Sequence, residues 1–392
     1  MLLDMDREFH IAVAIERTNG YARELIRGIA DFAAAHENLY FHLIDPERIR
    51  RPHEDFDAFI CRVDSDATAA RLKSRGKPVI DLFCRKPYAD FTAVRPDTAA
   101  IGRMAAEHFL ERRFRNFAFC GFESLRFSDT RCAAYAAALA EHGFSVRVHS
   151  VPAAIRRTFR DEYQTKGTAS AEADRVILRK WLRGLPKPVA IFCCDDFRAH
   201  HVVELCRETG LAIPKEVAVL GVDDDPVLCT FSSPRLSSVN PDAYGIGRTA
   251  AETVAARLDG KTADAAIRIP PKGVIARTST ETYPLDPPWL SDAMVFIARN
   301  AKAGISASDV FRHIGLSHTT VQDAFRRTLG SAVQREIVSA RLEEAKRLLT
   351  STELPVTEIA RQSGFSDVCY FTRAFTRALR ASPLRYRQSQ SN

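Results

Sequence analysis

The first 280 residues alternate short apolar runs with longer stretches in which apolar residues recur at helical spacing. Continuous apolar runs occur at 11–15, 58–61, 78–83, 117–120, 189–193 and 217–221, and helical spacing lies between them at 99–112, 130–142 and 197–210. Strands that are apolar throughout are typical of parallel sheets buried on both faces, with helices as the connections. The pattern predicts an α/β region, and its many strands favour two lobes rather than one sheet.

The pattern changes at 283–288, the Pro-rich stretch YPLDPP. Proline removes backbone donors and restrains the residue before it, so this stretch predicts a linker. Beyond it the spacing is helical to the end of the chain, and seven helices are expected at about 289–301, 306–313, 317–329, 331–351, 356–362, 366–379 and 383–388. The predicted domains are therefore 8–282, the linker 283–288 and an all-α domain at 289–392.

The helical part contains one motif twice. Residues 309–317 (DVFRHIGLS) return 49 residues later as 358–366 (EIARQSGFS), and apolar residues four apart follow each copy. A short helix, a Gly turn, a Ser N-cap and a longer helix form a helix-turn-helix. We predict two such motifs, at 306–329 and 356–379, joined by a connector helix at 331–351 that spans roughly 30 Å. Such spacing approaches the roughly 34 Å repeat of B-DNA, so both second helices are expected to enter successive major grooves.

The charge of the chain is concentrated in the same region. Residues 290–392 hold 15 Lys and Arg against 9 Asp and Glu, a net of +6, out of +7 for the whole chain. This coincidence with the repeat indicates a surface that binds DNA. On the two second helices the residues expected to face outward, and so to contact bases or phosphates, are His318, Thr319, Gln322, Asp323, Arg326, Asp367, Val368, Cys369, Tyr370, Arg373 and Arg377. For each of them alone, a solvated position on a helix is the alternative.

Several classes of protein find no support in the sequence. No run of about 18 apolar residues predicts a membrane span, and the N-terminus does not look like a secretory signal, so a cytoplasmic protein is expected. The nine cysteines are odd in number and form no Cys-x-x-Cys motif, which favours reduced, buried thiols. No Gly-x-Gly-x-x-Gly motif indicates a dinucleotide, and Asp223-Asp224-Asp225 lacks the ligand spacing of a known calcium loop. We expect no metal and no cofactor.

The helical domain resembles the DNA-binding domain of the AraC/XylS family of transcription regulators. The resemblance lies in Gly364-Phe365-Ser366, in 370–375 (YFTRAF), in 382–387 (SPLRYR), and in Arg341-Leu342, Ala345 and Leu348-Leu349 of the connector. Two positions depart from the family pattern: Arg380, where Gly is usual, and Ala332, where Pro or Ser is commoner. Neither is expected on a DNA-facing surface.

Residues 9–280 resemble the sugar-binding core of LacI-type repressors and periplasmic sugar-binding proteins. The resemblance lies in Pro96-Asp97-Thr98, Gly102-Arg103, 106–109 (AEHF), 119–122 (FCGF) with Arg131, Cys194-Asp195-Asp196, 213–224 (IPKEVAVLGVDD) and 234–239 (PRLSSV). It implies two Rossmann-like lobes joined by three crossovers, with the ligand in the cleft. We place the lobes at about 8–112 with 241–262 and 113–240 with 263–282.

Candidate ligand-binding residues follow from that fold. Ligands of parallel sheets lie beyond the carboxyl ends of the strands, and Asp97, Asp195 and Asp223 each follow an apolar run or its extension. Carboxylates and Arg make charge-assisted hydrogen bonds to sugar hydroxyls. The resemblance implies Asp97, Arg131, Asp195 and Asp223 in the cleft, and Arg17, Tyr21 and Arg23 are further candidates on the first strand-to-helix loop. An Asp at a strand end is also often only an N-cap.

The order of the two parts narrows the expected function. A LacI-type sensor followed by an AraC-type reader, at this length, resembles a group of sugar-responsive regulators along the whole chain. The resemblance implies an activator that binds direct or inverted half-sites as a homodimer, with D-xylose as the effector and RNA polymerase as a further partner. It implies no enzymatic activity. Three alternatives stay open: a regulator of the same architecture that responds to another sugar or small molecule, a sugar-processing enzyme with a helical appendage, and a transport-type binding protein.

Overall fold

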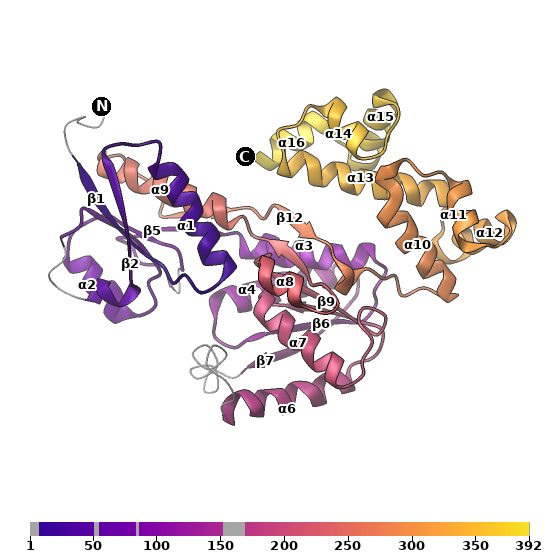
Figure 1. The fold of residues 1–392 in the computed structure, drawn as a ribbon, viewed down its shortest axis with the longest axis horizontal. Helices are drawn as coiled ribbons and strands as arrows, with labels where there is room; N and C mark the ends of the chain where they lie inside the picture. The colour runs from indigo at the N-terminus through magenta and orange to yellow at the C-terminus, as the bar shows by residue number, and fades with distance from the viewer. Residues whose placement is uncertain (1–7, 51–54, 84–85, 152–168, 392) are drawn as a thin grey trace.

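The structure is a computed structural model that describes residues 8–50, 55–83, 86–151 and 169–391. Two six-stranded sheets form two α/β lobes, and an all-helical domain follows them (Figure 1). The first sheet, in lobe 1, has the order β11 (Ala266–Ile269), β5 (Thr92–Pro96), β4 (Val79–Asp81), β3 (Ala58–Cys61), β1 (Phe9–Ala14) and β2 (Leu39–Ile44). Its strands are all parallel. The predicted fold class is confirmed.

The second sheet, in lobe 2, has the order β12 (Gly273–Ile275), β10 (Ser237–Asn240), β9 (Val217–Val222), β8 (Val189–Cys193), β6 (Phe117–Phe122) and β7 (Val146–Val151). Only β12 runs antiparallel to its neighbour among these strands. Every residue of β6, β8 and β9 is buried, as the continuous apolar runs predict for central strands covered on both faces.

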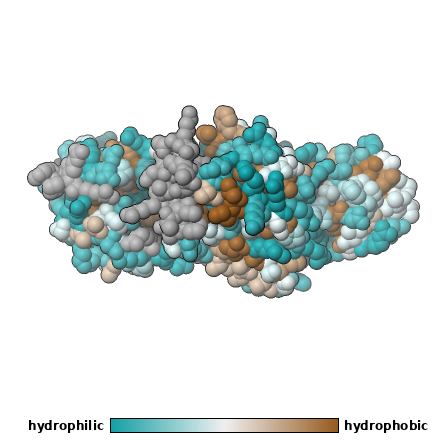
Figure 2. Space-filling model, turned by 90° about the horizontal axis from the view of Figure 1, so that it is seen from below, coloured by the Kyte–Doolittle hydropathy of each residue, from teal (hydrophilic) through white to brown (hydrophobic). Residues whose placement is uncertain are grey.

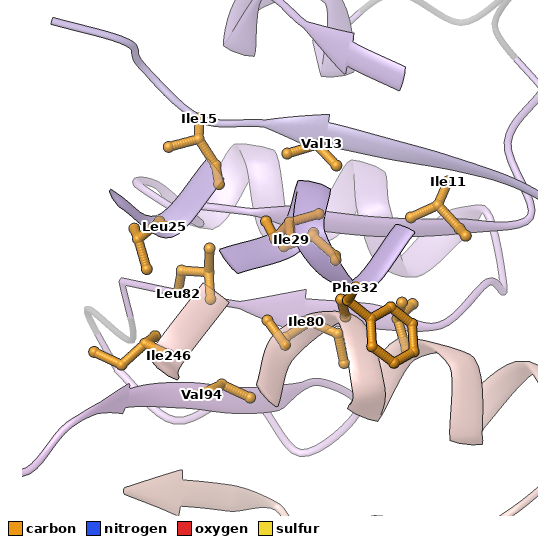
Figure 3. Packing of buried hydrophobic residues seen from close by; sticks show 14 of the residues in the cluster. Ile11, Val13, Ile15, Leu25, Ile29, Phe32, Ile80, Leu82, Val94 and Ile246 are labelled. Atoms are coloured by element: carbon orange, nitrogen blue, oxygen red, sulfur yellow. The ribbon is translucent and has the colours of Figure 1, made fainter. Parts of the chain in front are cut away.

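Helices cover both faces of each sheet. In lobe 1, α1 (Gly20–Ala33) and α9 (Ala243–Leu258) share a core with one face of the sheet (Figure 3). Helix α2 (Asp66–Ser74) and the 3-10 helix η1 (Pro46–Arg50) lie on the other face. In lobe 2, α3 (Thr98–Glu111) and α4 (Arg126–Ala140) pack on one face, and α6 (Ala169–Gly184) and α7 (Asp196–Glu208) on the other. The short α8 (Pro226–Phe231) follows β9.

The lobe boundaries differ from the predicted ones in two places. Helix α3, expected in lobe 1, packs on lobe 2, where Ile101, Ala105 and Phe109 join the same buried cluster as β6. A Cβ on Gly102 would lie 2.5 Å from the carbonyl oxygen of Arg131, so this close helix contact requires glycine. Strand β11, expected in lobe 2, pairs with β5 in lobe 1. The chain thus crosses between lobes directly before α3, after β10 and between β11 and β12.

The helical domain has the seven predicted helices: α10 (Pro288–Asn300), α11 (Ala307–Ile314), α12 (His318–Leu329), α13 (Val333–Ser351), α14 (Val356–Gln362), α15 (Val368–Leu379) and α16 (Pro383–Ser391). A short 3-10 helix, η3 (Ala301–Ala303), follows α10. Gly315 and Gly364 take positive φ at the two helix-turn-helix turns. Ser317 caps α12 as predicted, but Asp367 rather than Ser366 caps α15, which therefore begins two residues later than expected.

The helical domain lies against lobe 2 (Figure 1). After β12 the chain stays on lobe 2 as the 3-10 helix η2 (Thr278–Thr280). There Ser279 Oγ accepts a hydrogen bond from Ser237 N at 2.8 Å and donates one to Val219 O at 2.6 Å. Strand β12 and α3 also reach toward α13. Viewed from below, the molecule is mostly hydrophilic, with a hydrophobic area near its middle (Figure 2).

Candidate functional site

The carboxyl ends of strands from both lobes bring one cluster of charged side chains together. Asp223 follows β9, and its carboxyl group is acted on by Arg131 of α4, by Asp195 and Asp225 of lobe 2, and by Arg62 of lobe 1. Burial raises the pKa of Asp223 to about 7, against the partial compensation of the two arginines. A carboxyl group tuned this close to neutrality is more typical of a ligand site than of a surface turn.

Arg131 supplies the central cation of this cluster. Its side chain is only 3% exposed, and its Nη1 donates to the carbonyl oxygen of Cys194 at the end of β8. The guanidinium lies over the ring of Phe127, 5.2 Å from its centroid. A buried cation is costly unless several groups hold it, and these contacts hold the Arg131 guanidinium within lobe 2, near enough to lower the pKa of Asp223.

Tyr21 approaches the same cluster from lobe 1. Burial and the nearby Asp223 raise the pKa of its phenol well above the usual range, while Arg62 and Arg131 act in the opposite direction. Next to it, the backbone N–H of Gly20 donates to Asp225 Oδ2 at 2.7 Å. Gly20 begins α1 of lobe 1 and Asp225 caps α8 of lobe 2, so this hydrogen bond joins the two lobes directly.

Two of the predicted carboxylates also serve as helix caps. Asp97 Oδ1 accepts from Ala99 N at 3.0 Å and Ala100 N at 2.9 Å, and Asp195 Oδ1 accepts from Arg198 N at 2.7 Å. Capping does not exclude ligand binding, because each carboxylate has further lone pairs. Asp195 belongs to the cluster around Asp223, whereas Asp97 lies beside a separate hollow.

Arg17 and Arg23 are not brought into the cluster by any contact found in the described residues. Both side chains are exposed, and Arg23 Nη1 donates to the carbonyl oxygen of Arg17 at 3.4 Å. Arg17 lies on the loop before α1, and Arg23 lies in the first turn of α1. Their assignment to the ligand site remains a prediction.

The sequence reasoning missed Arg62. It follows β3, its Nη1 donates to Glu16 Oε2 at 3.0 Å, and its guanidinium lies 4.6 Å from the ring centroid of Phe83. Arg62 obeys the same rule that selected the aspartates, since it comes directly after an apolar strand. Extending that rule from carboxylates to every charged residue at a strand end would have found it.

A hollow of about 380 Å³ lies beside the charged cluster. We call it the larger hollow; Phe83 of lobe 1 and the residues Ser124, Leu125, Arg126, Phe127, Asp129 and Thr130 of lobe 2 line it. Its size is within the range of small-molecule sites. Phe83 and Phe127 carry the Arg62 and Arg131 guanidiniums on their rings, so the same two aromatic residues border both the hollow and the cluster.

The second helices of the helical domain expose most of the predicted DNA-facing residues. On α12, His318, Thr319, Asp323 and Arg326 are exposed, and around α15 the exposed residues are Asp367, Val368, Cys369, Tyr370, Arg373 and Arg377. Asp367 accepts from Tyr370 N, so it has a capping role in addition. The opposite stripes are buried, with Val321 and Phe325 in one motif and Phe371 and Phe375 in the other.

Gln322 departs from the prediction. Its side chain is half-buried, and its Oε1 is buried without a hydrogen-bond partner in the described structure. Gln322 follows Val321 and lies on the same side of α12 as Leu329, seven residues on, so it borders the apolar stripe rather than facing away from it. Its place on a DNA-contacting surface remains a prediction.

Arg341 of α13 holds the two motifs together. It is 8% exposed, its Nε donates to Ala301 O at 3.0 Å, its Nη2 donates to Ile305 O at 2.8 Å, and its guanidinium lies 5.8 Å from the ring centroid of Phe365. The carbonyls belong to the first motif's side of the domain and Phe365 to the second. One buried cation thus fixes how the two DNA-facing helices sit relative to each other.

No helix among the described residues is long and apolar enough to cross a membrane. The described part of the chain also has no group of three or more His, Cys, Asp or Glu side chains placed to hold a metal ion.

Two known domain families match this chain. A periplasmic binding protein-like domain matches residues 106–280, and a helix-turn-helix domain matches residues 310–389. The first match covers lobe 2 and the later crossings, and the second covers both helix-turn-helix motifs.

Relatives of known function match both parts together. The chain is 25% identical to the xylose operon regulatory protein of Haemophilus influenzae over 97% of this chain and 99% of the relative. It is also 25% identical to the xylose operon regulatory protein of Escherichia coli K12, over 98% of each. A solved structure of a xylose-binding transcription activator superposes with a TM-score of 0.62 at 23% identity, covering 99% of this chain and all of that one. The chain is therefore a DNA-binding transcription regulator that joins a periplasmic-binding-protein-like sensor to a helix-turn-helix domain, homologous along nearly its full length to xylose operon regulatory proteins.

Proposed function

We propose that this regulator is a D-xylose-dependent activator of genes for xylose use. The observation that carries the proposal is the Asp223, Arg131, Asp195 and Arg62 cluster, which meets Tyr21 where the two lobes touch. The names of the full-length relatives support D-xylose as the sugar. A sugar hydroxyl both donates and accepts, so a polyhydroxylated ligand needs acceptors and donors from the protein. In this cluster ionised carboxylates accept, guanidiniums donate, and the phenol can do either.

The larger hollow gives the sugar a place beside this cluster. Its volume of about 380 Å³ suits a monosaccharide, and Phe83 and Phe127 offer apolar ring faces from opposite lobes. A pyranose has an apolar side made of C–H groups, which packs on aromatic rings, while its hydroxyls point toward charged partners. A sugar held between Phe83 and Phe127 would contact both lobes and so favour the form in which they are together.

Helix α3 supplies a route from the cleft to the DNA-binding domain. It begins at Thr98, is capped by Asp97, and its 14 residues span roughly 21 Å to Glu111. At that end Arg112 Nε donates to Thr280 O at 3.1 Å, just before the linker. Glu111 lies near Lys346 and Glu343 of α13. Because α3 packs on lobe 2, a movement of lobe 2 would carry the connector helix and both DNA-reading motifs with it.

The ligand can change DNA binding only by its difference in affinity for the two arrangements of the lobes. Each subunit would place α12 and α15 in adjacent major grooves, since the 19 residues of α13 span roughly 28 Å between the two motifs. We further propose a homodimer that binds direct or inverted half-sites in the cytoplasm and recruits RNA polymerase.

The test measures DNA affinity with and without sugar. A duplex selected from a random library by the full chain is labelled, and its Kd is measured by fluorescence anisotropy in the absence and presence of saturating D-xylose, with L-arabinose and D-ribose in parallel. We expect D-xylose to change the Kd by several-fold or more, within the range typical of coupling between two sites. Equal affinities with and without D-xylose would remove the effector assignment.

Two substitutions separate the domains in this assay. Arg131→Ala should abolish the D-xylose response and leave the affinity for DNA without sugar, because Arg131 is remote from α12 and α15. The matched control, Arg71→Ala on the exposed surface of α2, should retain both properties. Loss of sugar-free DNA binding in Arg131→Ala would contradict the modular arrangement.

A further inference from the structure

A second, smaller hollow lies next to the larger one and has a different chemistry. Its volume is about 80 Å³, and it is lined by Arg95, Pro96, Asp97, Thr98, Ala99, Arg126, Thr130 and Arg268. Arg126 and Thr130 line both hollows. A water molecule accounts for roughly 30 Å³ of liquid, so the smaller hollow has room for a group of several non-hydrogen atoms.

Three guanidiniums from three different elements meet at the smaller hollow. Arg95 comes from β5, Arg268 from β11 and Arg126 from the first turn of α4. The opposing charge in the lining is the single carboxylate of Asp97, whose Oδ1 accepts two backbone N–H groups of α3. Among the described residues that line the hollow, the arginines outnumber the carboxylates three to one.

The sheet places two of these arginines in direct opposition. Arg268 is the register partner of Arg95 in the parallel pair β11 and β5, so the two side chains leave the same face of lobe 1. Like charges opposite each other on neighbouring strands are destabilising. An anion bound beside them would be attracted by both side chains.

The helix ends add to the same positive field. Helix α3 begins at Thr98 and α4 at Arg126, both of which line the hollow, and each helix is long enough to carry a full dipole at its N-terminus. Asp97 caps α3, but no side chain caps the first turn of α4. Uncapped N–H groups at a helix start are donors for an anion.

We propose that the smaller hollow binds a phosphate group. Arginine forks match the oxygens of a phosphate in pairs, and the shared lining of the two hollows lets one molecule occupy both. The group is either free phosphate or the phosphate of a phosphorylated sugar whose ring lies in the larger hollow. This proposal concerns an anion subsite and does not depend on D-xylose being the effector.

The test uses isothermal titration calorimetry on the full chain at constant ionic strength, which keeps screening equal in every titration. The titrants are inorganic phosphate, D-xylose, D-xylose 5-phosphate and, as a monovalent anion control, chloride. We expect the wild-type protein to bind phosphate compounds. If D-xylose 5-phosphate binds more tightly than either phosphate or D-xylose, the ligand is a phosphorylated sugar. If phosphate binds comparably with and without D-xylose, the ligand is free phosphate.

Arg268→Gln is the decisive variant, because Arg268 is exposed on an edge strand and its replacement leaves both cores intact. Losing one charged hydrogen-bonding partner should weaken phosphate binding about tenfold or more, with D-xylose binding unchanged. Arg71→Gln, an exposed arginine of α2, is the matched control and should bind phosphate as the wild type does. Failure of every phosphate compound to bind the wild type, or equal phosphate affinity in Arg268→Gln, would overturn the proposal; failure of D-xylose alone would affect only the effector assignment.

Discussion

Replacing Gly20 with alanine tests whether contact between the lobes controls the sugar response. The backbone N–H of Gly20 donates to Asp225 across the lobes, and a Cβ added to Gly20 would lie 2.7 Å from Asp225 Oδ2, 2.9 Å from its Cγ and 3.2 Å from its Cα. A rotation of the carboxylate alone does not relieve the contact with the Cα atom. The lobes of Gly20→Ala must therefore separate slightly, or the start of α1 must shift.

The expected magnitude follows from the cost of overpacking. Adding a methyl group to a tightly packed contact costs about 1–3 kcal/mol. If that cost falls only on the arrangement with the lobes together, D-xylose should bind about 5- to 150-fold more weakly, at 1.4 kcal/mol for each factor of ten. The sugar-free protein should lose less than about 1 kcal/mol of unfolding free energy, because separating the lobes leaves each hydrophobic core packed.

Calorimetric titration with D-xylose and urea unfolding without sugar measure the two quantities. Gly184→Ala is the matched control: Gly184 ends α6, and an added Cβ there meets nothing within 4 Å. An unchanged affinity for D-xylose in Gly20→Ala would refute the reasoning. So would an equal loss of stability in the sugar-free protein, since the contact would then be part of the fold rather than of lobe closure.

Three further predictions concern the reader, its turns and the charged cluster. Arg373→Ala should weaken binding to a selected duplex by about 1–3 kcal/mol without changing D-xylose affinity, as measured by anisotropy and calorimetry; equal loss for random DNA would mark a phosphate contact instead. Arg380 ends α15 with a φ of 57°, where the first motif has Gly330 at 67°, so Arg380→Gly should raise and Gly330→Ala should lower the unfolding free energy by about 1 kcal/mol each. Because burial raises the pKa of Asp223 to about 7, against roughly 3.9 when unfolded, the folded state favours its protonated form. Urea unfolding should therefore show the wild type losing stability relative to Asp223→Asn as pH rises from about 4 to about 7, and parallel pH profiles would contradict this.

The predictable part of the fold was the part that depends on local pattern. The buried strands and the helices of the reader follow from apolar spacing and from turn glycines, such as Gly315 and Gly364, that need a positive φ. The lobe boundaries did not follow, because the place of α3 is decided by the close approach of Gly102 to Arg131, a contact between distant segments. Strand β11 is a short, partly exposed edge strand, so its sequence does not say which sheet it joins.

The candidate site divides in the same way. Strand-end position predicted Asp195 and Asp223, and the resemblance supplied Arg131, which lies on a helix and has no such signal. Arg62 was not predicted, because the strand-end rule was applied to carboxylates alone. Gln322 is less exposed than predicted, because helical spacing gives the face on which a side chain lies but not whether its neighbours cover its amide group.

The last crossing of the chain has a mechanical consequence. Since β12 and η2 are held to lobe 2 directly before the linker, the helical domain is attached to lobe 2, and we expect a hinge rotation between the lobes to displace lobe 1 with respect to both. Within a single subunit such a rotation leaves the orientation of α12 and α15 relative to lobe 2 unchanged. A second copy that grips lobe 1 would turn the same rotation into a new distance between the two pairs of reading helices.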